Sequence, residues 1–469
     1  MERTLIKNGI IATAADTVRA DLLIDGSVIA KIGPGLGEAD ARVIDAAGCY
    51  VIPGGVDVHT HLNLEAHGVK VGDGFFVGTA SAAFGGTTCV VEHPGFGPDG
   101  CSLLYQVERY REKALGETVV DYGLHAVFQH VDEMVLDELK DLAVKGVPSG
   151  KIYLTYDGRL NDRDILEVLD RARATGMLAA FHAENDAIIS FLRDKLRAEG
   201  KRAPIHHALS RPDYCEAEAI SRILHLAEAA GVAQVYIVHL STALGLLAIE
   251  EGRRRGLTVY AEVCPQHLLL DDSCYLEPEH GGLKYIMAPP LRKKEDCAAL
   301  WNGLATGSID VVATDHCSFN FADKLALGKE DFSKCPGGIP GVETRLPLIF
   351  SEGVLKGRLS LNRFVDVVST APARIMGLYP RKGTLEPGSD ADVVVLDPQH
   401  EKIITPGNLY HNADYSPYEG MKVRGWPVLT MVRGKVIMQH GRLLAEKGWG
   451  EYVERRLMPE ASSKKEIRK

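Results

Sequence analysis

The stretch GGVDVHTHLN, residues 54–63, follows the apolar run CYVIPG and places His59 and His61 two residues apart. The run predicts a buried β-strand that ends at these two histidines. Because alternate side chains of a strand face the same way, we expect Asp57, His59 and His61 on one face. Two convergent imidazoles favour a divalent metal. A His-x-His pattern also arises by chance among 17 histidines, so other residues of the chain are needed to distinguish a metal site from a chance pattern.

From residue 50 to about 320, short β-rich runs alternate with longer amphipathic stretches, which is typical of βα units and a parallel sheet. A helix is expected at 161–176, with Asn161 or Asp162 as N-cap and Gly176 as its stop. Eight strands with helical crossovers predict an α/β fold of the TIM (β/α)8 barrel type. The strand candidates are 49–61, 87–95, 121–130, 149–156, 177–184, 235–241, 257–266 and 310–317.

The two flanks of the barrel contain further β-like runs, such as DLLIDGSVIAKIG (21–33) and DADVVVLDP (390–398). A small composite β-sandwich built from both chain ends would explain these runs. We therefore expect the sandwich in residues 1–53 and 385–440, the metal-dependent barrel in 54–384, and a C-terminal extension in 441–469.

Composition restricts the class of partner. The net charge of −10 argues against nucleic acid or an anionic membrane, since both require a basic face. No apolar run approaches the ~20 residues of a membrane span, and the start MERTLIKNG lacks the apolar segment of a secretory signal. The nine cysteines form no CxxC pair, as expected for reduced thiols. We expect a cytoplasmic protein whose partner is a small molecule.

Polar residues that end the predicted strands are candidates for chemistry, because the active site of a TIM barrel lies at the C-terminal ends of its strands. A single histidine at such a position is often a hydrogen-bonded wall residue. Ligand-type side chains on five strands, however, favour a metal site. The six candidate ligands are His59, His61, Lys151, His182, His239 and Asp315.

Lys151 differs from the other candidates, because a protonated amine repels cations. A neutral amine that takes up carbon dioxide becomes a carbamate, whose two oxygens could bridge metals ~3.5–4 Å apart. Taken alone, Lys151 is more simply interpreted as an ion-paired lysine. The surrounding candidate ligands favour carboxylation instead.

These residues, with CPQ (264–266), APPLR (288–292), DVVATDHC (310–317) and NADYSPYEG (412–420), resemble the cyclic amidohydrolases. The likeness is to the hydantoinase and dihydropyrimidinase branch, and within it to the bacterial D-hydantoinases. It runs from IKNG (6–9) to GTLEPGSDADVVVLDP (383–398). The resemblance implies a barrel with a composite sandwich, two divalent metals and a homotetramer.

The resemblance also implies roles for the candidate ligands. By position, His59, His61 and Asp315 would hold the more buried metal, and His182 and His239 the more exposed one. Lys151, as N6-carboxylysine, would bridge the two. Such enzymes usually carry zinc and sometimes manganese.

The residues expected around the substrate follow from the same resemblance. Tyr156 matches the family tyrosine that polarises the attacked carbonyl, and Asp315 is expected to accept the nucleophile's proton. Ala288 and Gly337 stand where the family commonly has Ser and Asn, in contacts made mainly through the main chain. The implied reaction opens 5-substituted hydantoins to N-carbamoyl amino acids, with D-selectivity.

Several alternatives stay open at this point. Dihydropyrimidinase, acting on dihydrouracil or dihydrothymine, is the main one. Dihydroorotases place an Arg where this chain has Asn63, and allantoinases usually continue with Glu-Pro-Gly where this chain reads LEAHG (64–68). A silent family member that acts as a binding protein would lack a ligand, and deaminases of exocyclic groups usually lack the lysine.

Apolar residues of the nearby loops are expected to line a pocket for a ring substituent, unless they pack in the core. Such a pocket, without an Arg at position 63, favours hydantoins with an apolar substituent over dihydroorotate. The residues concerned are Leu62, Leu64, Val69, Phe75, Phe76, Phe96 and Tyr153.

Overall fold

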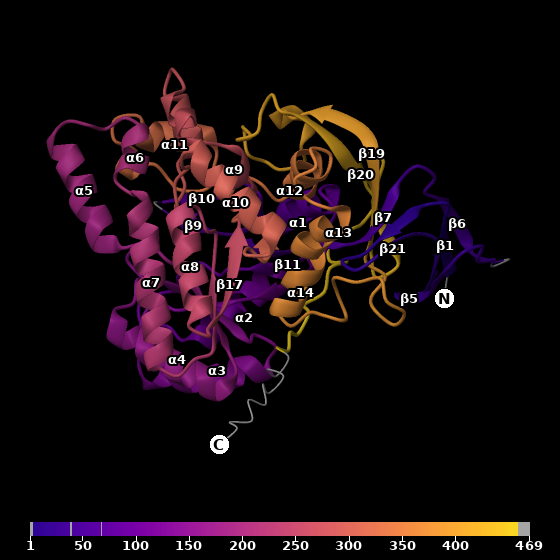
Figure 1. Cartoon of the computed structure of the whole chain (residues 1–469), viewed down its shortest axis with the longest axis horizontal. Helices are drawn as coiled ribbons and strands as arrows, with labels where there is room; N and C mark the ends of the chain where they lie inside the picture. Colours follow the sequence, from indigo (N-terminus) through magenta and orange to yellow (C-terminus); the bar gives the residue numbers. More distant parts are fainter. Residues whose placement is uncertain (1–2, 38–39, 67, 458–469) are drawn as a thin grey trace.

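The computed structural model describes residues 3–37, 40–66 and 68–457, and its larger part is a barrel of parallel strands surrounded by helices (Figure 1). A bridge between Thr60 and His316 and a 2.9 Å hydrogen bond from the Asp315 N–H to the His59 carbonyl close the barrel. Over the described ranges the barrel has eight strands, as predicted, if the two short strands β12 and β13, which are separated by one residue, are taken as one. These are β8 (Gly55–Thr60), β11 (Thr87–Glu92), β12 (Asp121–Leu124) with β13 (Ala126–Val127), β14 (Ser149–Tyr153), β15 (Leu178–His182), β16 (Gln234–Ile237), β17 (Thr258–Val263) and β18 (Val311–Val312).

The helix α4 (Asp162–Thr175) illustrates how the sequence sets the crossovers. The Asn161 side chain accepts from the Asp164 N–H, and Gly176 ends the helix at φ 72°, a conformation that glycine adopts without strain. Its buried face packs on the barrel through residues spaced three or four apart. These residues are Ile165, Val168, Leu169 and Ala172.

The other crossover helices follow the strands in the same way. No helix within the described ranges combines the length and the apolar composition needed to cross a membrane. The helices are α1 (Gly74–Phe84), α2 (Leu103–Ala114), α3 (Glu133–Val144), α5 (Asp186–Ala198), α6 (Ile205–Leu209), α7 (Asp213–Ala229), α8 (Ala243–Arg254), α9 (Pro265–Leu269), α10 (Lys294–Thr306), α11 (Phe321–Gly328), α12 (Arg345–Ile349), α13 (Leu361–Val365) and α14 (Ala371–Ile375).

A β-sandwich lies against one side of the barrel, where indigo N-terminal strands meet yellow C-terminal strands (Figure 1). Counted over the described residues, one sheet has the order β5-β4-β1-β6 and the other the order β22-β21-β20-β19-β7-β2-β3. Because β7 pairs with both β2 and β19, the two chain ends share one sheet, and the predicted composite sandwich is confirmed. Its strands are β1 (Arg3–Lys7), β2 (Ile10–Ala12), β3 (Thr17–Arg19), β4 (Asp21–Asp25), β5 (Val28–Gly33), β6 (Arg42–Asp45), β7 (Tyr50–Pro53), β19 (Val393–Ile403), β20 (Lys422–Val432), β21 (Lys435–Gln439) and β22 (Arg442–Leu443).

The run 49–61, predicted as one strand, forms two strands in different sheets. β7 belongs to the sandwich and β8 to the barrel, and Gly54 joins them. A Cβ atom at Gly54 would lie 2.0 Å from Thr88 Oγ1, so only glycine allows this close passage. The expected domain limits stay a prediction, and residues 458–469 of the expected extension lie outside the described residues.

Candidate active site

A cavity of about 880 Å³ opens at the C-terminal ends of the barrel strands. The polar residues predicted at these ends meet here because parallel strands all present their carboxyl ends at the same barrel mouth. All nine candidate site residues line this one cavity: His59, His61, Lys151, Tyr156, His182, His239, Ala288, Asp315 and Gly337.

One group of candidate ligands in this cavity joins the end of β8 to the residues after β18. The Nε2 atoms of His59 and His61 each lie 3.1 Å from Asp315 Oδ1. Burial alone would raise the pKa of the Asp315 carboxyl, but His59 and His61 hold it well below its ordinary value. Asp315 is therefore ionised, as a metal ligand or a proton acceptor must be.

Three of the candidate residues have strained backbone conformations. Tyr156 has φ 75°, His239 has φ 37° and Asp315 has φ 54°, in the left-handed region that residues with a Cβ rarely adopt. Such a conformation costs about 1–3 kcal/mol and persists only where the surroundings enforce it. Strain of this kind often accompanies a functional geometry.

Lys151, on β14, is completely buried, and its Nζ lies 3.3 Å from His59 Nε2. Burial lowers the pKa of its amine to about 8, while Asp315 and Glu262 act in the opposite direction. A larger fraction of the amine is therefore neutral near pH 7 than in an exposed lysine. The neutral amine is the form that can take up carbon dioxide.

His182 and His239 end β15 and follow β16, with their ring centroids 4.5 Å apart. His182 Nε2 lies 2.8 Å from Glu184 Oε2, and Arg211 donates to the same carboxylate oxygen at 2.5 Å. Burial alone would raise the pKa of Glu184, but Arg211 and His182 lower it to about 2. A fixed negative charge thus stands beside the second histidine pair.

Tyr156 lies at the rim of the cavity and is 40% exposed, with its ring centroid 5.3 Å from that of His182. Partial burial and nearby carboxylates raise the pKa of its hydroxyl, so it remains a hydrogen-bond donor. Ala288 and Gly337 also line the cavity. They belong to neighbouring segments that are joined by a 3.0 Å hydrogen bond from the Gly338 N–H to the Ile286 carbonyl.

Asp57 does not share a face with the two histidines, and this prediction was wrong. The pairing of β8 with β11 advances by three residues on β8, from Asp57 to Thr60, against two on β11. This bulge ends the simple alternation of side chains. The Asp57 carboxylate bonds Thr314 Oγ1 at 2.7 Å and lies 3.7 Å from Arg345 Nε, outside the wall of the cavity.

Sequence reasoning missed Glu262, on β17, which is completely buried behind the first histidine pair. Its Oε1 lies 2.7 Å from His59 Nδ1 and accepts from the His239 N–H at 3.0 Å. It therefore orients the His59 ring so that Nε2 faces the cavity. A carboxylate within the apolar run TVYAEV (258–263) was the signal that could have revealed it.

Only part of the expected apolar pocket lies in this cavity. Leu64, Phe96 and Tyr153 line it. Leu62, Phe75 and Phe76 pack in the main core, and Val69 packs with Val71 and Phe319, because these side chains turn away from the strand ends. Asn63 lines a neighbouring pocket and not this cavity.

The donor atoms suit a divalent metal. Those of His59, His61 and Asp315 lie within 4.8 Å of one another, and two histidines with a carboxylate are a common ligand set for zinc. The buried Nδ1 atoms of His61 and His239 have no hydrogen-bond partner within the described part of the chain. Buried imidazole nitrogens without a partner are unfavourable unless something else binds them.

A parallel (β/α)8 barrel with a cluster of possible metal ligands at its mouth is consistent with the amidohydrolase class of hydrolases. The profile of the amidohydrolase family matches residues 50–437. D-phenylhydantoinase of Escherichia coli is 47% identical over 97% of this chain and 98% of its own length. The chain therefore belongs to the amidohydrolase family, in its hydantoinase and dihydropyrimidinase branch.

Solved structures agree with this assignment. Dihydropyrimidinase from Brevibacillus agri superposes with a TM-score of 0.95 at 41% identity, over 97% of this chain and 99% of that one. D-hydantoinase from a Bacillus species has the same TM-score and identity, over 97% of this chain and 100% of its own. The predicted family is confirmed.

Proposed function

We propose that the protein is a binuclear metal hydrolase that opens 5-substituted hydantoins to N-carbamoyl amino acids, with D-selectivity. One observation carries the proposal: the six candidate ligands and Tyr156 line one cavity, in a chain 47% identical to D-phenylhydantoinase. All six candidate ligands are present, which argues against a catalytically silent family member that acts as a binding protein. Deaminases of exocyclic groups usually lack the lysine, so the presence of Lys151 argues against that class.

The residues would hold two divalent ions, zinc or manganese. His59, His61 and Asp315 would hold the more buried ion, and His182 and His239 the more exposed one. Lys151, as N6-carboxylysine, would supply oxygens to both. When bound, such ions lower the pKa of water so that hydroxide is available near neutral pH.

The chain's own residues would then act on the ring carbonyl next to the substituted carbon. The Tyr156 hydroxyl donates a hydrogen bond to this carbonyl oxygen as it gains negative charge. Asp315 accepts the proton of the attacking water and passes it to the ring nitrogen. The water oxygen joins the carbonyl carbon, the carbon–nitrogen bond breaks, and the nitrogen leaves with the proton.

Substrate position would depend on main-chain groups of Ala288 and Gly337. A Cβ atom added at Gly337 would meet only Met287 Cα, at 3.8 Å, so the absent side chain leaves space in this wall. Leu64, Phe96 and Tyr153 would pack against the ring substituent.

Dihydropyrimidinase activity is the second candidate, supported by the structural match to the Brevibacillus agri enzyme. Six-membered dihydropyrimidines carry the same ureide group as hydantoins. The apolar side of the cavity favours substrates with a bulky substituent, since its burial contributes about 25 cal/mol per Å² of apolar area.

A substrate panel tests the proposal and separates the candidates. The metal-loaded enzyme is assayed with 5-phenylhydantoin, dihydrouracil, allantoin and dihydroorotate. We expect kcat/KM to be highest for 5-phenylhydantoin, intermediate for dihydrouracil and lowest for the other two. Dihydrouracil ranked first would assign the protein to the dihydropyrimidinases, and dihydroorotate or allantoin ranked first would refute the proposal.

We also propose a cytoplasmic homotetramer. Large apolar side chains are exposed along α5 to α7, where they would pack against another copy, including Phe191 and Leu209 at 68% and 55% exposure. All nine cysteines lie in the described ranges and are free, as in a reducing compartment. Light scattering would give the mass of the assembly.

A further inference from the structure

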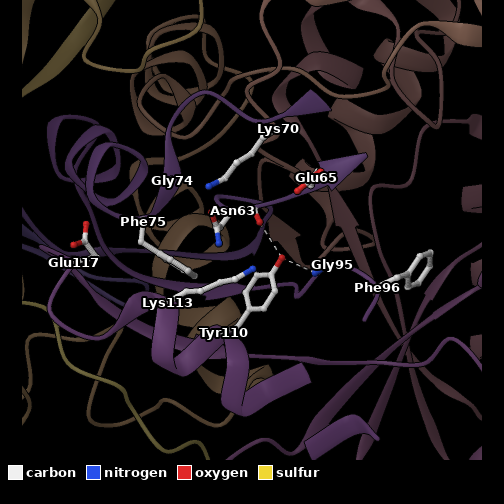
Figure 2. Close-up of a pocket in the computed structure, with 10 residues that line it drawn as sticks. All are labelled: Asn63, Glu65, Lys70, Gly74, Phe75, Gly95, Phe96, Tyr110, Lys113 and Glu117. Atoms are coloured by element: carbon white, nitrogen blue, oxygen red, sulfur yellow. Dashed lines mark hydrogen bonds between the residues drawn. The ribbon is translucent and has the colours of Figure 1, made fainter. Parts of the chain in front are cut away.

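A second pocket, of about 570 Å³, adjoins the catalytic cavity and shares Glu65, Gly95 and Phe96 with it. Its size is within the range of small-molecule sites. Of the side chains that enclose it, the proposed function uses only the shared Phe96. Figure 2 shows this side pocket, whose other walls include Asn63, Lys70, Phe75, Tyr110 and Lys113.

The floor of the side pocket is fixed by Tyr110, on α2. Its hydroxyl accepts a hydrogen bond from the Gly95 N–H at 2.7 Å and donates one to the Asn63 carbonyl at 3.0 Å (Figure 2). These bonds tie the residues after β8 to the residues after β11. The pocket is therefore held in shape before any ligand enters, which favours binding.

The Asn63 side chain is aimed into the side pocket (Figure 2) and the residue is only 9% exposed. Its backbone N–H and carbonyl are bonded to Glu92 and Tyr110. Its carboxamide has no hydrogen-bond partner among the described residues. Because this amide faces the pocket and is bonded to no described residue, it can both donate to and accept from a polar ligand.

Two lysines give the side pocket a positive charge. Lys70, on β10 (Val69–Lys70), and Lys113, on α2, extend toward Asn63 from opposite sides (Figure 2). Neither ammonium has an ion-pair partner within residues 3–37, 40–66 and 68–457. Lys113 Nζ lies 4.7 Å from the centre of the Tyr110 ring. Burial, and then the charge of Lys70, lower the pKa of Lys113.

Two carboxylates also line the side pocket. Glu117 is paired with Lys447 at 2.9 Å. Glu65 faces Lys70 in the register of β9 (Glu65–Ala66) and β10 and acts to raise the pKa of Lys113, so it favours the charged form of that lysine. Phe75 and Phe96 supply apolar surface beside the charge.

We propose that the side pocket binds a small organic carboxylate with an apolar group, namely the N-carbamoyl amino acid product. The choice of ligand rests on the proposed function. A hydantoin carries no carboxylate, and ring opening creates one. The side pocket therefore distinguishes product from substrate by charge, and its shared wall places it next to the site where the product forms.

Calorimetric titration of the metal-loaded enzyme tests this proposal. The ligands are N-carbamoyl-D-phenylglycine, phenylacetate and the neutral phenylacetamide. The double variant Lys70→Gln/Lys113→Gln should bind both carboxylates about fivefold more weakly, because two partly exposed charge pairs are lost. Phenylacetamide affinity and kcat/KM for 5-phenylhydantoin should not change. Lys140→Gln, an exposed lysine of α3, is the matched control and should behave as the wild type.

Equal affinity of wild type and double variant for the carboxylates would overturn the side pocket as their site. Lysine-dependent binding of phenylacetate without binding of N-carbamoyl-D-phenylglycine would overturn the assignment to the product. Phenylacetate binding does not depend on turnover. If no hydantoin is opened but phenylacetate still binds through the lysines, the proposed function fails and the preference for carboxylates stands.

Discussion

Replacement of Glu262 by glutamine is expected to weaken metal binding while leaving the barrel folded. The carboxylate accepts three contacts: His59 Nδ1 at 2.7 Å and the His239 N–H at 3.0 Å through Oε1, and the Tyr236 hydroxyl at 2.8 Å through Oε2. Glutamine keeps one carbonyl oxygen for the first two, and its amide can donate to the tyrosine oxygen. The shape and the hydrogen bonds therefore persist, and only the negative charge is lost.

Without this negative charge, the His59 imidazole is a weaker electron-pair donor to a metal ion. Removing a partner of this kind reduces metal affinity by about 10–100-fold, or about 1.4–2.7 kcal/mol. The assay is elemental analysis after dialysis against increasing chelator, with Tyr236→Phe as control, since that variant removes only the 2.8 Å contact. Glu262→Gln should lose metal at a lower chelator concentration than either the control or the wild type. Equal retention of metal by all three would refute this reasoning.

Three further predictions concern the candidate site. Elemental analysis of the active protein should give about two metals per chain. Lys151→Ala should lose activity and metal, and a short carboxylic acid added in solution should partly restore the activity. Near-normal turnover of Lys151→Ala would make Lys151 merely structural. Asp315→Asn should reduce kcat by about 10²–10⁴-fold with the thermal unfolding midpoint little changed, and wild-type rates in a metallated variant would assign proton transfer elsewhere. Gly337→Asn should fold normally, because a Cβ atom has room there, and should change kcat/KM for 5-phenylhydantoin and for dihydrouracil by the same factor, because Gly337 is proposed to act through its main chain. A selective loss for 5-phenylhydantoin would place the ring substituent at Gly337 and contradict its proposed position against Leu64, Phe96 and Tyr153.

The barrel and the residues of the catalytic cavity could be predicted from the sequence because both depend on local patterns. Four of the eight strand runs ended at or near a candidate ligand and a fifth carried Lys151, and parallel topology brings strand ends together. The composite sandwich followed from similar β-like runs at both ends of the chain. The roles of the nine cavity residues stay predictions, since contacts alone do not define them.

Other features depend on pairing between distant segments, which strand alternation cannot reveal. His93 follows its strand much as His59 ends β8, yet it stacks on His125 at 4.1 Å and lies outside the cavity wall. Asp57 is displaced by a bulge that exists only because β8 pairs with β11. The direction of Asn63 depends on Tyr110, 47 residues away in the sequence.

The central claim is that water opens the ring at the carbonyl next to the substituted carbon. Mass spectrometry of the product formed from 5-phenylhydantoin in ¹⁸O-labelled water tests this claim most directly. The account predicts N-carbamoylphenylglycine with one labelled oxygen in its carboxylate and no release of ammonia. Label in the carbamoyl group, release of ammonia, or recovery of unchanged hydantoin from metal-loaded enzyme would contradict it.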